Sequence, residues 1–517
     1  MTNETGIALA DGVTLDPDDW TDLRTQGHRM LDDMFDYLEH IRERPVWQTI
    51  PQEVRAHFRE TLPNAPTSLA NVYDEFAQFV LPYATGNTHP GFMGWVHGGG
   101  TAVGMLAEML AAGLNSNLGG RDHMPIEVER QIVEWMRQLY GFPEGASGLF
   151  VTGTSMANLI AVLVARTATL GANVRQEGVA QHGSLLRAYT SSAAHGCIAQ
   201  ALDLSGLGTD ALRCIPVDRT HRMDTKALID AIAADRRDGL TPFLVVATAG
   251  TVDTGAIDDL QAIADICRDE GLQFHVDGAF GALAALSSEL KHRVAGIERA
   301  DSIAFDFHKW GQVPYDAGFI LVRDGKSHRE AFAAPTAYLR RETRGLAAGT
   351  HWPCDYGPDL SRGFRALKTW FTLKTFGTEK LGAVIARTCA LARYLEERVL
   401  AEPRLEILAP AQLNILCFRY RALESDGVNG SIVSDLHESG IAAPSTTIID
   451  GQLAIRAAFV NHRTQPHDVD ALIEAILRFG RERTRNASRP ERNKEPDHTS
   501  VREIVKPMGG DKFPAFF

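Results

Sequence analysis

The stretch DSIAFDFHKWGQ, residues 301–312, places a lysine between a histidine and a tryptophan, directly after an apolar run typical of a buried strand. Lysine is normally a solvated surface residue, so Lys309 needs a chemical reason to follow such a run. A lysine whose pKa is lowered by burial is a nucleophile that attacks aldehydes. The stretch therefore predicts a buried, reactive lysine at the end of a strand.

Short apolar runs alternate with helical patterns around this stretch. SGLFVTG (147–153) is typical of a strand and SMANLIAVLVARTATL (155–170) of the helix after it, and TPFLVVATAG (241–250) and LQFHVDGAF (272–280) repeat the strand pattern. This alternation predicts an α/β fold with a mainly parallel sheet. Ligands of such sheets bind beyond the carboxyl ends of the strands, so the polar residues there are the candidates for function.

The predicted α/β region is the large domain among four segments. It covers residues 99–375 and follows a helical N-terminal segment, residues 1–98, in which amphipathic stretches alternate with prolines. Residues 376–485 are predicted to form a smaller C-terminal α/β domain, and residues 486–517 a charged tail.

The composition is that of a globular cytoplasmic protein. The 517-residue chain is 44% hydrophobic and 23% charged, and no apolar run approaches the ~18–20 residues that span a bilayer. Its net charge of −13 argues against nucleic acid or an anionic membrane as the main partner. The N-terminus lacks the features of a signal peptide, and the six cysteines form no C-x-x-C pair, which predicts reduced thiols in the cytoplasm and no metal site.

Motifs of several other enzyme classes are absent from the sequence. HGGG at residues 97–100 is similar to an esterase oxyanion loop, but the chain has no G-x-S-x-G nucleophile motif to complete it. The chain also lacks G-x-x-x-x-G-K-[ST], G-x-G-x-x-G and H-E-x-x-H. The sequence therefore does not support assignment to the hydrolases, the nucleoside triphosphatases or the Rossmann dehydrogenases.

Four features can combine into one site at the strand ends. Thr154 and Ser155 follow a glycine where a strand passes into a helix, and the free N–H groups of a helix N-terminus suit a phosphate. Asp277 ends an apolar strand, His195 begins a helical stretch, and Lys309 lies about one helix and one strand beyond Asp277. Taken singly, these residues also fit a helix cap, a structural salt bridge and a structural histidine.

Together the four features predict a pyridoxal 5'-phosphate (PLP) site. The aldehyde of this cofactor joins a lysine as a Schiff base, here Lys309. Asp277 pairs with the pyridinium nitrogen and keeps it protonated, so that the ring can accept electrons. His195 can lie over the ring face.

HVDGAFG (275–281) followed by DSIAFDFHKWGQ also resembles the group II PLP-dependent decarboxylases, which include the aromatic-L-amino-acid, glutamate and histidine decarboxylases. The resemblance covers roughly residues 17–480 and includes THPGFMGW, PIEVERQIVEW, VATAGTVDTGAID, SRGFRALKTWFTLKTFG and FVNHRT. It implies fold-type I, the aspartate-aminotransferase-like architecture. It also implies a homodimer with active sites at the interface.

The resemblance implies a role for each matching position. Val252 departs from the family pattern, which often has a second threonine there. The implied cofactor contacts are Lys309 to the aldehyde, Asp277 to the ring nitrogen, Ala279 and His195 against the ring, Thr251 near it, and Thr154, Ser155, Asp306 and His308 around the phosphate.

The substrate region differs from that of aromatic decarboxylases. Phe92 and Trp95 are retained, but His97 and glycines follow them. In GLNSNLGGRDH, which the resemblance implies to reach the partner's site, Asn117 stands where a more apolar residue would suit a bare aromatic ring. An aromatic L-amino acid is the expected substrate, and a hydroxylated ring or a smaller polar side chain stays open.

The predicted reaction is decarboxylation of an L-amino acid to an amine, with Tyr338 in APTAYLRRETRGL as proton donor. Related enzymes that consume oxygen and form aldehydes commonly have phenylalanine at this position. Because this chain has Tyr338, that reaction ranks second, as the first alternative to amine formation. An aminotransferase would need an arginine for the substrate carboxylate, for which Arg365 and Arg463 could be proposed. A catalytically silent homologue should have lost Lys309 or Asp277, and both are present.

Overall fold

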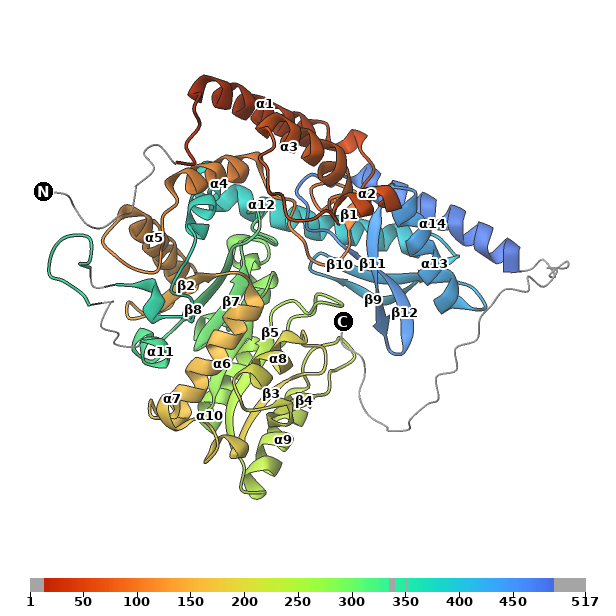
Figure 1. Ribbon diagram of the computed structural model, residues 1–517. Coiled ribbons are helices and arrows are strands. Elements are labelled where there is room, and N and C mark those ends of the chain that lie inside the picture. The colour runs from red at the N-terminus through yellow and green to blue at the C-terminus, as the bar shows by residue number, and fades with distance from the viewer. Residues whose placement is uncertain (1–13, 334–339, 350, 488–517) are drawn as a thin grey trace, which may run out of the picture.

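Two β-sheets organise the computed structural model of the protein, which describes residues 14–333, 340–349 and 351–487 (Figure 1). The prediction of an α/β fold with a mainly parallel sheet is confirmed. No helix within these described ranges is long and apolar enough to cross a membrane.

Seven strands of the described chain form the larger sheet, in the order β2-β8-β7-β6-β5-β3-β4. The neighbours from β7 to β4 pair in parallel, whereas β8 is antiparallel to both β2 and β7. The strands are β2 (Ser147–Val151), β3 (Leu186–Ser191), β4 (Leu212–Ile215), β5 (Thr241–Thr248), β6 (Gln273–Asp277), β7 (Ser302–Asp306) and β8 (Gly318–Val322).

Helices pack on this sheet and connect its strands. In α10 the apolar residues share one face, the Asp259 side chain caps the first turn by accepting from the Ala262 N–H, and Gly271 ends the helix at φ 65°. The helices of this part are α4 (Ala102–Leu114), α5 (Met124–Leu139), α6 (Thr154–Leu170), α7 (Val174–Glu177), α8 (Cys197–Leu204), α9 (Thr225–Arg237), α10 (Leu260–Glu270) and α11 (Gly325–Phe332).

The smaller sheet has the order β1-β11-β12-β10-β9 among the described residues. Its first strand comes from the N-terminal segment and pairs in parallel with β11. The elements are β1 (Phe92–Met93), β9 (Leu405–Gln412), β10 (Ile415–Tyr420), β11 (Ala443–Ile449) and β12 (Gln452–Ala458), with α13 (Ser425–Glu438) and α14 (Pro466–Ala487) packed on them.

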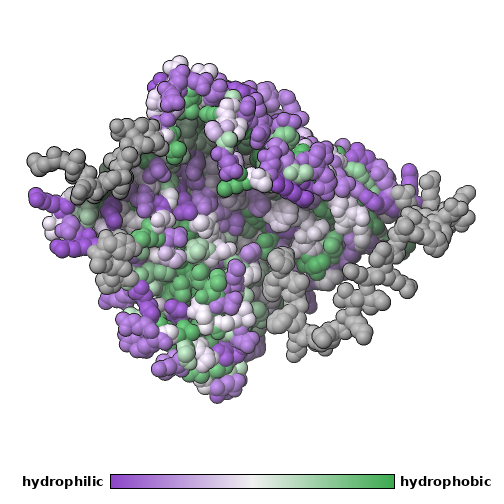
Figure 2. All heavy atoms as spheres, in the orientation of Figure 1, coloured by the Kyte–Doolittle hydropathy of each residue, from purple (hydrophilic) through white to green (hydrophobic). Residues whose placement is uncertain are grey.

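The long helix α12 (Arg365–Leu400) connects the two sheets and turns at Gly377, where φ is 71°. The boundary predicted at 375/376 falls just before this turn, and the predicted domain limits stay predictions. The N-terminal helices α1 (Trp20–Glu39), α2 (Gln52–His57) and α3 (Leu69–Glu75) lie along the upper side in Figure 1. That upper edge is mostly hydrophilic in Figure 2, and α1 has no buried residue.

The strand register brings polar residues to one edge of the larger sheet. Thr248, the last residue of β5, is paired with Asp277, the last residue of β6. Asp277 is in turn paired with Ala304 of β7, two residues before Asp306. Because these strands are parallel, their carboxyl ends lie side by side, and this edge is where a ligand site is expected.

A buried ion pair attaches α5 to the larger sheet. Glu129 of α5 and Arg362 are each 3% exposed, and the guanidinium Nη2 is 2.6 Å from the Glu129 Oε1. Arg362 also donates to the carbonyl of Phe150 in β2 at 2.8 Å. The pair is fully desolvated, so the loss of one partner leaves a buried charge without compensation.

Arg362→Leu is expected to lower the free energy of unfolding by about 3–5 kcal/mol, because the Glu129 carboxylate remains buried and unpaired. Urea unfolding followed by circular dichroism measures this loss. The control is Arg130→Leu, which breaks an exposed pair with Glu127 on the same helix and should cost less than about 1 kcal/mol. Equal losses in the two variants would contradict the assignment.

Candidate active site

A cavity of about 380 Å³ opens at the carboxyl ends of β5, β6 and β7. This size is in the range of small-molecule and cofactor sites. Most of the residues predicted from the sequence line it: Trp95, His97, Thr154, Ser155, His195, Asp277, Ala279, Asp306, His308 and Lys309.

Four other predicted residues lie elsewhere or outside the described chain. The Thr251 hydroxyl is turned into its own loop, where it contacts Thr254 and accepts from the Ala256 N–H at 3.0 Å. The predicted substrate residues Phe92 and Asn117 do not line the cavity. Phe92 is buried in β1, and the Asn117 side chain accepts from the backbone N–H groups of Gly119 and Arg362. Tyr338 lies outside the described residues. These four assignments stay predictions.

Lys309 is held by a carboxylate on its own turn. Its Nζ is 2.9 Å from the Oδ2 of Asp306, three residues earlier. Burial lowers the pKa of Lys309, but the negative charges of Asp306 and Asp277 outweigh burial, so the pKa is raised overall. The expected lowering of this pKa by burial alone was therefore wrong, because the sequence argument left out the nearby carboxylates.

Asp277 is buried, with 2% of its surface exposed. Its Oδ1 accepts from the Ala279 N–H at 3.1 Å, and its Oδ2 accepts from the Asn158 amide at 3.0 Å. Burial raises the pKa of Asp277, while the charge of Lys309 and these hydrogen bonds oppose the rise. The Asp277 carboxylate lines the cavity, and a cationic N–H group bound there would stabilise its charge.

The start of α6 offers an anion site beside this pair. No side chain caps the helix N-terminus at Gly153, and the Thr154 hydroxyl is buried without a hydrogen-bond partner. A Cβ built on Gly153 would lie 3.7 Å from the Cε1 of His308 and 3.9 Å from the Oδ1 of Asp306, so both residues flank the turn. Free N–H groups and an unpaired hydroxyl at a helix N-terminus fit the phosphate of PLP.

Three polar residues are among those of the cavity that the sequence argument missed. Thr248 ends β5 and has a buried hydroxyl without a partner. Cys197 begins α8, and its pKa is raised to about 12 by burial and by Asp277, so its thiol is protonated and unreactive. Tyr315 also lines the cavity, and it is partly exposed. The strand-end position could have indicated Thr248, whereas no pattern pointed to the other two.

Aromatic side chains form part of the cavity lining, which includes Trp95, His97 and Tyr315. The His97 ring packs against those of Phe92 and Trp95, with centroid distances of 5.6 and 5.8 Å, and the Tyr315 ring is 4.2 Å from that of His308. Burial, with a smaller effect from Lys309, lowers the pKa of His97, and burial lowers that of His308 to about 4. Both imidazoles are therefore neutral near pH 7.

The arginines considered for an aminotransferase are engaged outside the cavity. Arg365 pairs with Asp316 at 2.9 Å, and Arg463 donates to the carbonyls of Gly99 and Gly100 at 3.0 and 3.2 Å. Neither residue lines the cavity.

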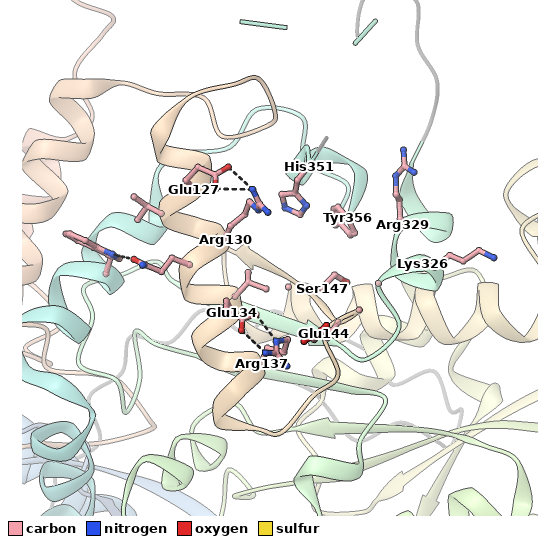
Figure 3. A pocket seen from close by; sticks show the side chains of 18 of the residues that line it. Glu127, Arg130, Glu134, Arg137, Glu144, Ser147, Lys326, Arg329, His351 and Tyr356 are labelled. Atoms are coloured by element: carbon pink, nitrogen blue, oxygen red, sulfur yellow. Dashed lines mark hydrogen bonds and ion pairs between the residues drawn. The ribbon is translucent and has the colours of Figure 1, made fainter. Parts of the chain in front are cut away.

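A larger cavity of about 840 Å³ lies between α5, β2 and α11 (Figure 3). Its charged side chains are largely satisfied by each other: Arg130 pairs with Glu127 at 2.8 Å and Arg137 with Glu134 at 2.6 Å. It lacks the buried lysine and strand-end carboxylates of the smaller cavity, so the chemistry lies in the smaller one.

Asp306→Asn is expected to lower the pKa of Lys309, because the nearest anion is lost while burial persists. Reductive methylation of the cofactor-free protein at a series of pH values, with each lysine quantified by mass spectrometry, measures this change. The reactivity of Lys309 should rise at lower pH than in the wild type. Lys326, with 84% of its side chain exposed, serves as the internal reference. An unmoved Lys309 profile would contradict the assignment.

Comparisons with known proteins agree with this geometry. The family description "Pyridoxal-dependent decarboxylase conserved domain" matches residues 51–421. An aromatic-L-amino-acid decarboxylase of Bacillus atrophaeus is 32% identical over 472 residues, which cover 89% of this chain and 96% of that protein. A histidine decarboxylase of Mus musculus is 30% identical over 463 residues, covering 86% of this chain and 68% of that protein.

A solved structure is similar over most of the chain. The crystal structure of Oryza sativa TDC with PLP and tryptamine has a TM-score of 0.84 and 25% sequence identity, covering 91% of this chain and 100% of that one. The predicted family, cofactor and enzyme class are confirmed: the chain belongs to the pyridoxal-dependent decarboxylase family, and it is a PLP-dependent amino-acid decarboxylase.

Proposed function

We propose that the protein decarboxylates an aromatic L-amino acid to the corresponding amine and CO₂. One observation carries this proposal: Lys309, Asp277 and the N-terminus of α6 line a single cavity, and the aromatic rings of Trp95 and Tyr315 line it too. The similarity to the aromatic-L-amino-acid decarboxylase of Bacillus atrophaeus supports the aromatic substrate.

The residues of the cavity divide the work of holding the cofactor. Lys309 presents its Nζ to the aldehyde, and the free N–H groups of α6 with the Thr154 and Ser155 hydroxyls bind the phosphate. Asp277 accepts a hydrogen bond from the ring nitrogen, and Ala279 and His195 flank the ring. When bound, PLP supplies an electron-withdrawing ring that accepts the electrons of the bond to the departing carboxylate.

After CO₂ leaves, the α-carbon needs a proton to become an amine. We propose Tyr338 as its donor, on the strength of the family resemblance alone. Within the described residues, His195 and His308 are the alternatives, and the proton of His308 can be placed. The Nδ1 of His308 accepts from the Ala317 N–H at 3.0 Å, which leaves the proton of the neutral ring on Nε2. The ring packs against Tyr315 and lines the cavity, so this proton can be delivered there.

The substrate side chain is proposed to lie against the aromatic side chains of the cavity lining. Trp95 is 51% exposed, and its backbone φ of 46° is unusual for a residue other than glycine. Its peptide oxygen accepts from the buried guanidinium of Arg456 at 3.1 Å, which fixes this turn to the smaller sheet. An aromatic side chain would gain stacking contact with the exposed indole.

The active unit is proposed to be a cytoplasmic homodimer. Three apolar side chains of α4 (Met109, Leu110 and Leu114) are exposed, and burial against a second copy would remove them from water. Asn117, in the loop after α4, does not line the cavity of its own chain. It is expected to contribute to the cavity of the partner. Light scattering during size-exclusion chromatography measures the mass.

Lys309→Ala is expected to abolish turnover, because the amine that anchors the aldehyde is absent. The wild type and the variant are loaded with PLP and incubated with the standard amino acids, DOPA and 5-hydroxytryptophan. Amine, CO₂, aldehyde and oxygen uptake are measured. An aromatic amine with CO₂ from the wild type alone is expected. Aldehyde with oxygen uptake would replace the amine-forming assignment, and equal activity in the variant would overturn the role of Lys309.

Trp95→Ala is expected to raise KM for an aromatic amino acid about 3- to 10-fold, the worth of one aromatic contact, with a smaller change in kcat. A small polar amino acid should show no such rise. The control is Trp370→Ala, which removes an indole that lines the larger cavity and bonds Gln131 at 2.7 Å. A KM that is the same in the wild type and Trp95→Ala would exclude Trp95 from the binding site.

A further inference from the structure

A chain of hydrogen bonds runs from Asp277 away from the cavity into the core. Asp277 Oδ2 is 3.0 Å from the Nδ2 of Asn158, a residue of α6 that is 0% exposed. The Oδ1 of the same amide is 2.8 Å from the Nε2 of His275, and His275 Nδ1 is 2.8 Å from the Ser302 hydroxyl. The four side chains therefore connect α6 with β6 and β7.

Each link of this chain fixes the next one. An ionised Asp277 only accepts hydrogen bonds, so the NH₂ group of Asn158 has to face it. The amide oxygen then faces His275, which must donate from Nε2. Burial lowers the pKa of His275 to about 3, so the ring is neutral near pH 7 and has one N–H. Its Nδ1 then carries no proton and accepts a hydrogen bond from the Ser302 hydroxyl at 2.8 Å, which is closer than the Ser302 carbonyl oxygen at 3.2 Å.

The reverse arrangement would favour a protonated Asp277. With the amide turned over, the Asn158 oxygen would face Asp277 and would require a proton on the carboxyl group. The Asn158 NH₂ would then need an acceptor at His275 Nε2, so the imidazole proton would sit on Nδ1. The carboxyl group would lose a donor that stabilises its charge, and a neutral acid is a weak partner for a cationic ring nitrogen.

Asp277 depends on this donor because the described residues place no cation within ion-pairing distance of it. Apart from Asn158, its close donors are the Ala279 N–H at 3.1 Å and the Cys197 thiol, whose sulfur is 3.9 Å away. Burial works against the charge of Asp277. A hydrogen bond to a charged group in such surroundings is worth more than one between neutral groups.

We propose that Asn158, oriented by His275, is a positioning residue that keeps Asp277 ionised and directed at the ring nitrogen of the cofactor. This inference rests on the proposed role of Asp277. It assigns a function to two buried polar residues that touch neither the cavity nor the substrate.

The test compares the binding of PLP with that of its 1-deaza analogue, in which C–H replaces the ring nitrogen. Both retain the aldehyde and the phosphate, so only PLP senses the charge of Asp277. Asn158→Leu in the full-length, cofactor-free protein should weaken PLP about 10-fold or more, as expected for losing a hydrogen bond to a charged group. Binding of the analogue should change less than about 2-fold. Equilibrium dialysis measures both constants.

Further variants separate orientation from packing. Asn158→Ala removes the donor with a different change in packing, so it should show the same selective loss of PLP if Asn158→Leu fails to fold. His275→Phe should also weaken PLP selectively. His275→Gln retains a donor toward the Asn158 oxygen and should restore the wild-type preference for PLP over the analogue.

The control for loss of a buried amide is Asn429→Leu. Asn429 is 0% exposed in α13 of the smaller domain and donates to the Tyr420 carbonyl at 2.9 Å, far along the chain from the cavity. The Asn429→Leu variant should bind PLP and the 1-deaza analogue as tightly as the wild type does. Equal weakening of PLP and analogue by the Asn158 variants, or no weakening of either, would overturn the proposal. A wild type that binds neither compound would instead overturn the proposed function.

Discussion

The buried carboxylate of Asp277 is the constraint on which the rest of the site depends. Taking a charge out of water costs several kcal/mol unless the protein supplies compensating donors. Here the compensation comes from a backbone N–H, an amide of α6 and the charge of Lys309, which lies in the turn after β7. The negative charge that these donors leave uncompensated is directed at the cavity, where the protonated ring nitrogen of the cofactor can pair with it.

The parallel sheet makes this arrangement possible. Because β5, β6 and β7 end at the same edge, Thr248, Asp277 and Asp306 come together although α10 and three short 3-10 helices separate them in the chain. The antiparallel strand β8 lies between β7 and β2, and its first residue, Gly318, packs on the backbone of Gly153, where a Cβ would lie 2.4 Å from that residue's Cα. The anion site and the lysine are thus fixed by the same strands.

Strand ends could be recognised in the sequence, and the residues there were predicted correctly as neighbours. Contacts that depend on exact distances could not be predicted from the sequence. The three-residue spacing of Asp306 and Lys309 was visible, but the sign of the lysine's pKa shift depends on a separation of 2.9 Å. Thr251 was expected at the ring, yet its hydroxyl serves its own turn. Asn158 lies within a helix that reads as apolar, so nothing in its neighbourhood marked it as part of the site.

The use of an amide, and not an arginine, behind Asp277 has a chemical consequence. An arginine would stabilise the ionised carboxylate by neutralising it, and a second cation at the ring nitrogen would then gain little. The Asn158 amide donates a hydrogen bond without carrying charge, so the negative charge of Asp277 stays available to the cavity. The imidazole of His275 orients this amide and, being neutral, adds no positive charge of its own. A relay of neutral donors therefore holds the carboxylate in place while leaving its full electrostatic effect for the cofactor.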